Sequence, residues 1–260
     1  MSMNKTIGGI LLVSGTTIGG GVLALPTATI SGGFYPAALT FITCWFFMTF
    51  CALLMLEVCL WAPREINLIS MASDTLGVSG KVLAWAAYVV LLYALISAYL
   101  MGSNAWMLKL MSDNFNLRIS SFASIPILAG LIGFIIYLGT GAADKINRIF
   151  AVGLLLAYST LIVIGMPNVD LRLIDVGDLG TVSKTVPLII TTFGFSIVIP
   201  SLTFYLEHDH KRLRHVVIIG SIIPLIAYLL WEFVTLGILS IDGPYGLEAL
   251  AKNADSTEVA

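Results

Sequence analysis

The sequence has few charged residues and no cluster of basic ones. Asp, Glu, Lys and Arg make up 11% of the 260 residues, against roughly 25% in an ordinary soluble domain. With 58% apolar residues and a mean hydropathy of +0.98, the chain has too little polar surface to coat a water-soluble globule. The lipid bilayer is therefore the expected solvent. The net charge of −2 and the lack of a Lys/Arg-rich block exclude the electrostatic footprint of a nucleic-acid-binding protein.

Cysteine and histidine are also scarce. All three cysteines, Cys44, Cys51 and Cys59, fall in one apolar run, which supports neither a disulfide framework nor a zinc ribbon. The three histidines all lie between residues 207 and 215, with a spacing that matches no standard zinc site, so no metal is expected. The chain also has no His-Glu-x-x-His or Gly-x-Ser-x-Gly motif, and this argues against an intramembrane enzyme.

Long apolar runs dominate what is present. A helix needs about 20 apolar residues to cross a hydrocarbon core of about 30 Å. Seven segments qualify: 6–30, 34–61, 80–108, 121–140, 147–166, 186–206 and 216–240. The sequence predicts an all-α membrane protein with a single transmembrane domain over residues 1–240. A polar tail over residues 241–260 follows it, with no further apolar run.

The distribution of Lys and Arg between the spans predicts the orientation, because basic residues accumulate on the cytoplasmic side. With the N-terminus inside, eight basic residues are cytoplasmic and five are on the other side. The cytoplasmic set is Lys5, Arg64, Lys81, Lys145, Arg148, Lys211, Arg212 and Arg214. We expect a cytoplasmic N-terminus, with the tail outside.

Glycines crowd the first span. Four of them, Gly15, Gly19, Gly20 and Gly21, fall within seven positions, and Pro26 follows. Each glycine costs about 1 kcal/mol relative to alanine inside a helix, so we expect the helix to unwind near residues 19–21. Free backbone groups at that depth must face protein or a polar cavity, where they suit a carboxylate or a cation. The alternative is a close-packing Gly-xxx-Gly face formed by Gly15 and Gly19.

The sixth span repeats this pattern. Thr191-Thr192-Phe193-Gly194 is followed by an apolar stretch and Pro200, much as Thr16-Thr17-Ile18-Gly19 is followed by Pro26. A pair of interrupted spans at corresponding positions indicates a transporter built from repeats. Five spans precede the sixth, so it starts from the opposite side of the membrane and the second repeat is inverted.

Three segments in this order carry a resemblance to a known family. They are residues 15–26, the Leu53-Leu54-Met55-Leu56-Glu57-Val58 segment and residues 192–202, with further likeness at residues 144–148 and 205–231. The chain resembles the hydroxy and aromatic amino acid permease family of the amino acid-polyamine-organocation superfamily, and within it the tyrosine and tryptophan permeases. The resemblance implies a leucine-transporter-type fold of five plus five inverted helices, with helices 1 and 6 broken. It also implies proton-coupled import of aromatic amino acids through the bacterial inner membrane.

The chain departs from that family in its number of helices. Family members have about eleven helices, whereas seven are predicted here, corresponding to the first repeat and the start of the second. The alternative to a transporter is therefore a truncated fragment, or a split half that needs a partner chain to supply the missing helices. A seven-helix receptor is a weaker alternative, because such receptors have an external N-terminus and a cytoplasmic one is predicted here. A retinal protein also expects a lysine in the last span, and residues 216–240 contain none.

Substrate recognition is predicted at the two breaks. Amide groups around residues 16–21 would hold the substrate carboxylate, carbonyl groups near residues 192–196 its ammonium, and two Phe side chains its ring. Tyr93 and Ser97, four residues apart in the third span, are secondary candidates. For each side chain taken alone, ordinary helix packing is the alternative. The candidate residues are Gly15, Thr16, Thr17, Gly19, Gly20, Gly21, Tyr93, Ser97, Thr192, Phe193, Gly194, Phe195 and Ser196.

Two carboxylates inside the spans, Glu57 and Glu232, are candidates for carrying a coupled proton. A carboxylate in hydrocarbon costs at least about 2–3 kcal/mol, so each should be protonated or paired within the protein. For Glu57 the alternative is a carboxylate at the inner surface that faces Arg64. No cofactor is expected. The driving force is the proton gradient, and the sequence leaves sodium open.

Overall fold

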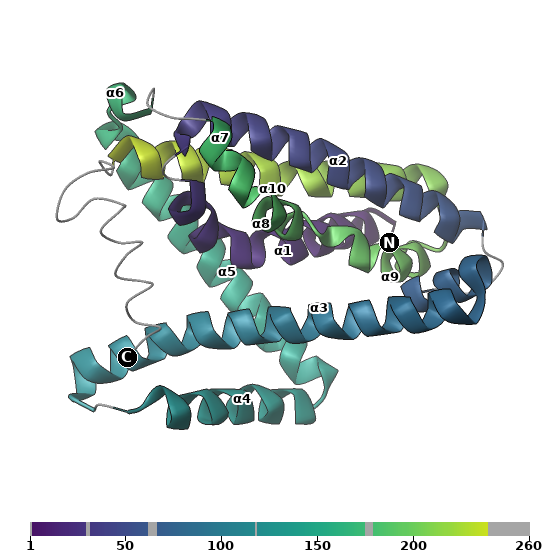
Figure 1. Ribbon diagram of the computed structural model, residues 1–260, viewed down its shortest axis with the longest axis horizontal. Coiled ribbons are helices and arrows are strands. Elements are labelled where there is room, and N and C mark those ends of the chain that lie inside the picture. The colour runs from purple at the N-terminus through teal and green to yellow at the C-terminus, as the bar shows by residue number, and fades with distance from the viewer. Residues whose placement is uncertain (1, 30–31, 62–66, 118, 175–178, 239–260) are drawn as a thin grey trace. The chain divides into compact units, whose positions relative to one another are not determined.

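The computed structural model describes residues 2–29, 32–61, 67–117, 119–174 and 179–238. Within its helices, the side chains of residues 2–4, 19–24, 27, 140–148, 151, 179 and 181 lie outside the description. All regular structure in the described ranges is helical (Figure 1). The chain divides into two compact units, one formed by residues 1–68 and 159–260 and the other by residues 69–158.

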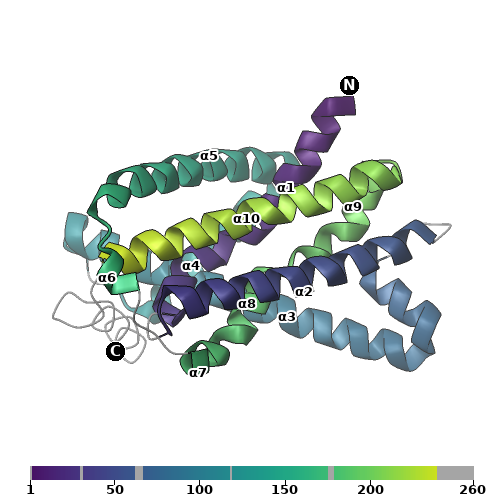
Figure 2. The same cartoon turned by 90° about the horizontal axis from the view of Figure 1, so that it is seen from above.

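The first unit contains three long helices. They are α1 (Ser2–Thr29), α2 (Phe34–Trp61) and α10 (His210–Ile238). Helix α10 packs against both α1 and α2 and lies between them (Figures 1 and 2). Its buried side chains, among them Leu213, Val216 and Val217, form the core together with Val13 of α1 and Phe41 of α2.

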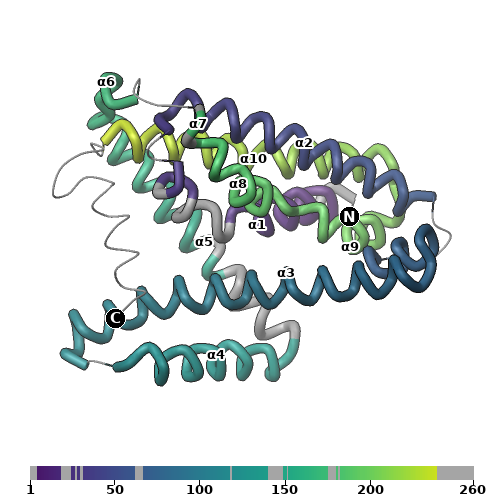
Figure 3. Tube along the Cα trace, in the orientation of Figure 1, coloured from purple at the N-terminus to yellow at the C-terminus, as the bar shows by residue number. Residues whose placement is uncertain are grey.

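Shorter elements complete this unit. Helix α5 (Thr140–Gly165) enters it with its last turns and continues into η2 (Met166–Asn168) and α6 (Leu171–Ile174). The chain then runs through α7 (Leu179–Val182), η3 (Ser183–Thr185), α8 (Val186–Thr192), η4 (Phe195–Val198) and α9 (Ile199–Tyr205). The segment from α8 to α9 packs against α1 and α2 (Figure 3).

The second unit contains α3 (Leu68–Phe115), α4 (Ser121–Tyr137) and the first part of α5. Helix α3 bends at Gly77, which has a φ of 69° that side-chain-bearing residues rarely adopt. Large apolar side chains such as Val90, Phe134 and Leu156 are exposed along all three helices. A helix that is apolar on all faces is typical of a lipid environment.

Within the part of the chain that the structure describes, four helical segments are long and apolar enough to cross a membrane: Phe34–Trp61, Leu68–Phe115, Ser183–Tyr205 and His210–Ile238. Three shorter apolar helices cover Lys5–Ile18, Ser121–Tyr137 and Val152–Asn168. Each of these segments overlaps a predicted span, but only the four longer ones support the prediction of a membrane-crossing helix, and the count of seven spans stays a prediction. The all-α prediction is confirmed, while the arrangement as five plus five repeats stays a prediction.

The structure corrects the predicted break in the first span. Helix α1 is one α-helix from Ser2 to Thr29, with Pro26 in its last turns. Each glycine destabilises a helix by about 1 kcal/mol relative to alanine. A backbone N–H or C=O group left without a hydrogen bond in an apolar surrounding costs several kcal/mol. Keeping the helical hydrogen bonds is therefore cheaper than unwinding, unless other groups take over as partners. The side chains at residues 19–24 lie outside the described part, so no contact is assigned to Gly19, Gly20 or Gly21.

Candidate functional site

The sixth span is interrupted at the position that the sequence singled out. Helix α8 ends at Thr192, and Phe193 and Gly194 have φ/ψ values of −87°/20° and −75°/32°, outside the helical range. The Gly194 N–H donates to the Thr191 carbonyl at 3.1 Å, and the Phe195 N–H donates to the Phe193 carbonyl at 2.9 Å. These bonds span three and two residues rather than four. The backbone here is therefore no longer tied up in an α-helical ladder.

Gly194 and Pro200 explain where the interruption falls. A Cβ added at Gly194 would lie 2.8 Å from the Thr191 carbonyl oxygen, so this geometry requires glycine. Pro200 has no N–H to give to a preceding turn and stands in the first turn of α9, where a proline fits best. The helix therefore ends before Gly194 and starts again at Ile199.

The two predicted Phe residues are buried rather than exposed to a cavity. Phe193 is 0% exposed and Phe195 is 1% exposed. The Phe193 ring meets the Tyr228 ring of α10 edge to face, with centroids 5.6 Å apart. In this conformation both Phe side chains pack in the core, and their role in substrate binding stays a prediction. Ser196 and Thr192 next to them are half-buried, and the Thr192 hydroxyl donates to the Leu188 carbonyl at 2.9 Å.

Tyr228 joins this interruption to the first helix. Its hydroxyl donates to the Thr17 carbonyl of α1 at 2.5 Å, while its ring contacts Phe193. One buried side chain thus connects the two segments that the sequence predicted to form one site. The sequence did not point to Tyr228, because its role depends on which helix face turns toward α1.

The other predicted residues of α1 are placed differently from one another. Thr17 is buried and donates to the Val13 carbonyl at 2.8 Å. Gly15 and Thr16 are exposed, and a Cβ added at Gly15 would meet nothing within 4 Å. Gly15 therefore makes no close contact with the described residues, and the Gly-xxx-Gly alternative, which also needs Gly19, stays untested. Helices α1 and α10 approach each other closely at Gly220, where a Cβ would lie 2.8 Å from Val13 Cβ, and at Gly9, where a Cβ would lie 3.0 Å from Val216 Cγ1.

Tyr93 and Ser97 both lie on α3 in the second unit, and both are exposed. The interrupted segment belongs to the first unit. Their role in substrate binding stays a prediction.

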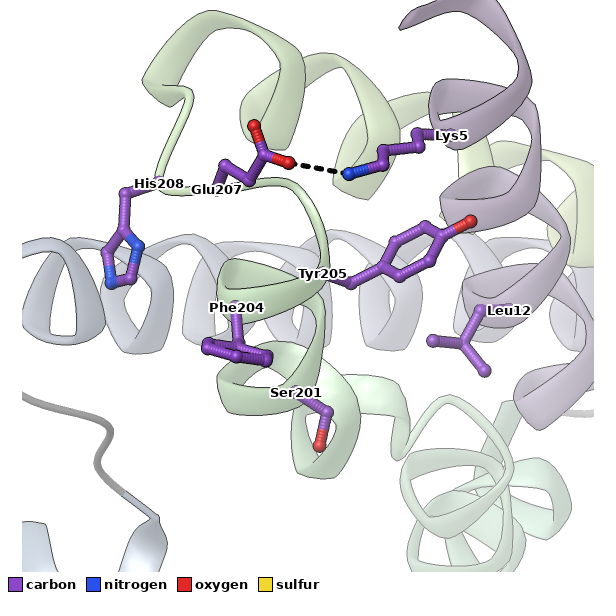
Figure 4. A pocket seen from close by; sticks show the side chains of 7 residues that line it. All are labelled: Lys5, Leu12, Ser201, Phe204, Tyr205, Glu207 and His208. Atoms are coloured by element: carbon purple, nitrogen blue, oxygen red, sulfur yellow. Dashed lines mark hydrogen bonds and ion pairs between the residues drawn. The ribbon is translucent and has the colours of Figure 1, made fainter. Parts of the chain in front are cut away.

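Ion pairs hold one end of the first unit. The Lys5 ammonium of α1 lies 2.6 Å from the Glu207 carboxylate in the turn after α9, beside Tyr205, in a groove of about 760 Å³ (Figure 4). The hydrogen bond and charge of Lys5 lower the pKa of Glu207. This contact is therefore present above the ordinary pKa of glutamate and is lost as the pH falls through the lowered value. The beginning of α1 and the end of α9 thus lie together, so the two segments run in opposite directions.

Glu57 belongs to the same end. Its carboxylate lies 3.1 Å from the Arg214 guanidinium and accepts a hydrogen bond from the Trp61 indole N–H at 3.2 Å. Its side chain is 42% exposed. This geometry favours the interpretation of Glu57 as a paired surface carboxylate, although the partner is Arg214. Arg64, the partner considered from the sequence, lies outside the described residues.

Glu232 has a different environment. Its side chain is 0% exposed and lies where the last turn of α1 meets α10. One carboxylate oxygen is in hydrogen-bond contact with the Thr29 hydroxyl. Within the described part of the chain, the other oxygen, Oε2, is buried without a partner.

These features define a multi-pass helical membrane protein whose described part contains an interrupted helix and a buried carboxylate. A family model, that of the tryptophan/tyrosine permease family, matches residues 2–256. The chain belongs to this family.

Several curated relatives of the chain are transport proteins. The chain is 34% identical over 240 residues to tyrosine-specific transport system 1 of Haemophilus influenzae, covering 92% of this chain and 59% of the relative. It is 32% identical to tyrosine-specific transport system 2 of the same organism, covering 92% and 60%, and 33% identical to glutamine transporter 2 of Aliivibrio fischeri, covering 91% and 62%. The chain thus spans about three fifths of the length of these relatives. No solved structure matches it.

Proposed function

We propose that the protein is a secondary transporter that imports tyrosine or tryptophan across the bacterial inner membrane by proton symport, with its N-terminus in the cytoplasm. The interrupted helix from α8 to α9 is the observation that carries this proposal. It sets backbone groups outside the helical ladder next to α1, in a family whose named relatives include tyrosine and tryptophan transport proteins. Such groups suit the charged ends of an amino acid.

The substrate site of this proposal is centred on the interruption. Carbonyl groups near residues 192–196 would accept hydrogen bonds from the substrate ammonium group. An aromatic substrate ring would take the edge-to-face contact that Tyr228 now makes with Phe193. The Tyr228 hydroxyl also donates a hydrogen bond to the Thr17 carbonyl, so displacement of Tyr228 by the substrate would weaken the contact between α1 and α10. Binding and the movement of α1 in alternating access are thereby connected.

Binding of labelled tyrosine to the protein in lipid vesicles tests this site. We expect tryptophan and phenylalanine to compete with tyrosine, and glutamine to compete poorly, because only aromatic rings replace the Tyr228 contact. Phe193→Leu keeps an apolar side chain and removes the ring, so it should weaken tyrosine binding by about 0.5–1.5 kcal/mol. The measurement is made on the 260-residue chain and on a protein extended to the length of its relatives.

Phe122→Leu is the matched control, since Phe122 is 92% exposed on α4 in the second unit. It should leave tyrosine affinity unchanged. Glutamine binding in preference to tyrosine, or equal affinities in Phe193→Leu and the unsubstituted protein, would contradict the proposed substrate and site.

A further inference from the structure

The hydrogen bonds of the Thr29 hydroxyl indicate whether the Glu232 carboxyl group is protonated. The Thr29 hydroxyl lies 2.7 Å from the Leu25 carbonyl oxygen and is also in contact with the Glu232 carboxyl group. A carbonyl oxygen can only accept, and a threonine hydroxyl carries one hydrogen. If Thr29 donates to Leu25, the second contact requires the hydrogen of a protonated Glu232. With Glu232 ionised, two acceptors compete for one hydrogen.

The burial of Glu232 points the same way. Its side chain is 0% exposed, and Oε2 has no hydrogen-bond partner within the described residues. An ionised carboxylate buried with an unpaired oxygen is costly, whereas the protonated form leaves only a carbonyl oxygen without a partner. The edge-to-face rings of Phe34 and the adjacent Phe233, 5.3 Å apart, add apolar surface to this region.

Neighbouring charges do not offset an ionised Glu232. The elements packed against this part of α10 are α1, α2, the end of α5, η2 and α6. The charged residues of these elements nearest to this part of α10 are Asp170 and Arg172. The Asp170 carboxylate accepts a hydrogen bond from the Arg172 backbone N–H at 2.9 Å. The remaining titratable neighbours are Tyr35, which is 62% exposed, and Tyr228, which donates to Thr17. Among the described residues, no cation forms an ion pair with Glu232.

The charges of α1 and α2 lie at the opposite end of the unit. Lys5 pairs with Glu207, and Glu57 pairs with Arg214. Glu232 is thus separated from the ion-paired end and sits where the last turn of α1 meets α10.

We propose that Glu232 is the proton-binding site of the transport cycle, and that Thr29 ties its protonation to the position of the end of α1. This inference rests on the proposed function. With the proton bound, the carboxyl group donates to Thr29, Thr29 donates to Leu25, and α1 stays against α10. Loss of the proton to water leaves a carboxylate that needs solvent, so the contact with Thr29 opens. The proton is neither created nor consumed: it enters at the carboxylate from one side and leaves to water on the other.

Infrared spectroscopy of the protein in vesicles tests the protonation directly. A protonated carboxyl group has its own C=O absorption, distinct from that of a carboxylate. We expect this band at neutral pH, its loss in Glu232→Gln and its retention in Glu57→Gln. Thr29→Val removes the hydrogen-bond partner but not the acid, so the band should shift in frequency and remain. This second variant tests the proposal even if Glu232→Gln does not fold.

Transport gives the second arm of the test. In Glu232→Gln we expect loss of tyrosine uptake driven by a pH gradient, with exchange of labelled for unlabelled tyrosine retained. A band unaffected by Glu232→Gln, or uptake driven by a sodium gradient and not by a pH gradient, would overturn the proton site. A Glu232-dependent band in a protein that takes up no amino acid would instead overturn the proposed function and leave the protonation of Glu232 standing.

Discussion

At the scale of single residues, the polar side chains of α10 connect it to both of its neighbours. The Ser221 hydroxyl accepts hydrogen bonds from the Trp45 indole N–H at 3.1 Å and the Thr49 hydroxyl at 3.3 Å, both from α2. On the side of α1, Tyr228 donates to the Thr17 carbonyl. In an apolar surrounding such bonds give a helix pair a fixed rotation, because a rotated helix would leave them unmade.

Gly194 is the residue on which the interruption depends most directly. We expect Gly194→Ala to disrupt it, because the new Cβ would lie 2.8 Å from the Thr191 carbonyl oxygen. Overpacking of this kind costs about 1–3 kcal/mol. The temperature of thermal unfolding in detergent should therefore fall, and the affinity for tyrosine should decrease. Gly130→Ala on α4 is the matched control, since a Cβ there would meet nothing within 4 Å. A Gly194→Ala protein as stable as Gly130→Ala would contradict the close contact.

At the scale of elements, α1 and the α8–α9 segment show what a sequence pattern can predict. Both contain Thr-Thr-x-Gly followed by a proline, yet only the second is interrupted. The position of the proline explains part of this difference. Pro200 lies in the first turn of α9, whereas Pro26 lies in the last turns of α1. The pattern located the weak points of both helices. Whether the helix breaks there depends on packing partners that the pattern does not specify.

Helices α1 and α10 approach each other closely at Gly220. A Cβ at Gly220 would lie 2.8 Å from Val13 Cβ and 3.3 Å from the Ile10 carbonyl oxygen. We expect Gly220→Ala to push the helices apart and lower stability by about 1–3 kcal/mol. Val13→Ala combined with it should restore part of the loss by removing the opposing methyl groups. Unfolding temperatures of the single and double variants measure this. Additive losses in the double variant would contradict direct contact between the two positions.

At the scale of the whole molecule, the helical class and four long apolar helices could be predicted, because a span needs only length and composition. The division into two units could not, since it depends on which helices pack together. Nor did the sequence choose between Glu57 and Glu232, because their difference lies in partners on other elements: Arg214 for one and the Thr29 hydroxyl for the other. Of the predicted substrate residues, the structure brings together Thr17 and Phe193 through Tyr228.

Uptake of labelled tyrosine into vesicles under an imposed pH gradient tests the central claim most directly. The protein, studied as the 260-residue chain and at the length of its relatives, should accumulate tyrosine or tryptophan when the outside is more acidic. Uptake should stop when a protonophore collapses the gradient. Accumulation of glutamine in place of the aromatic amino acids, or aromatic uptake that persists without the gradient, would contradict the proposed proton-coupled transport of aromatic amino acids.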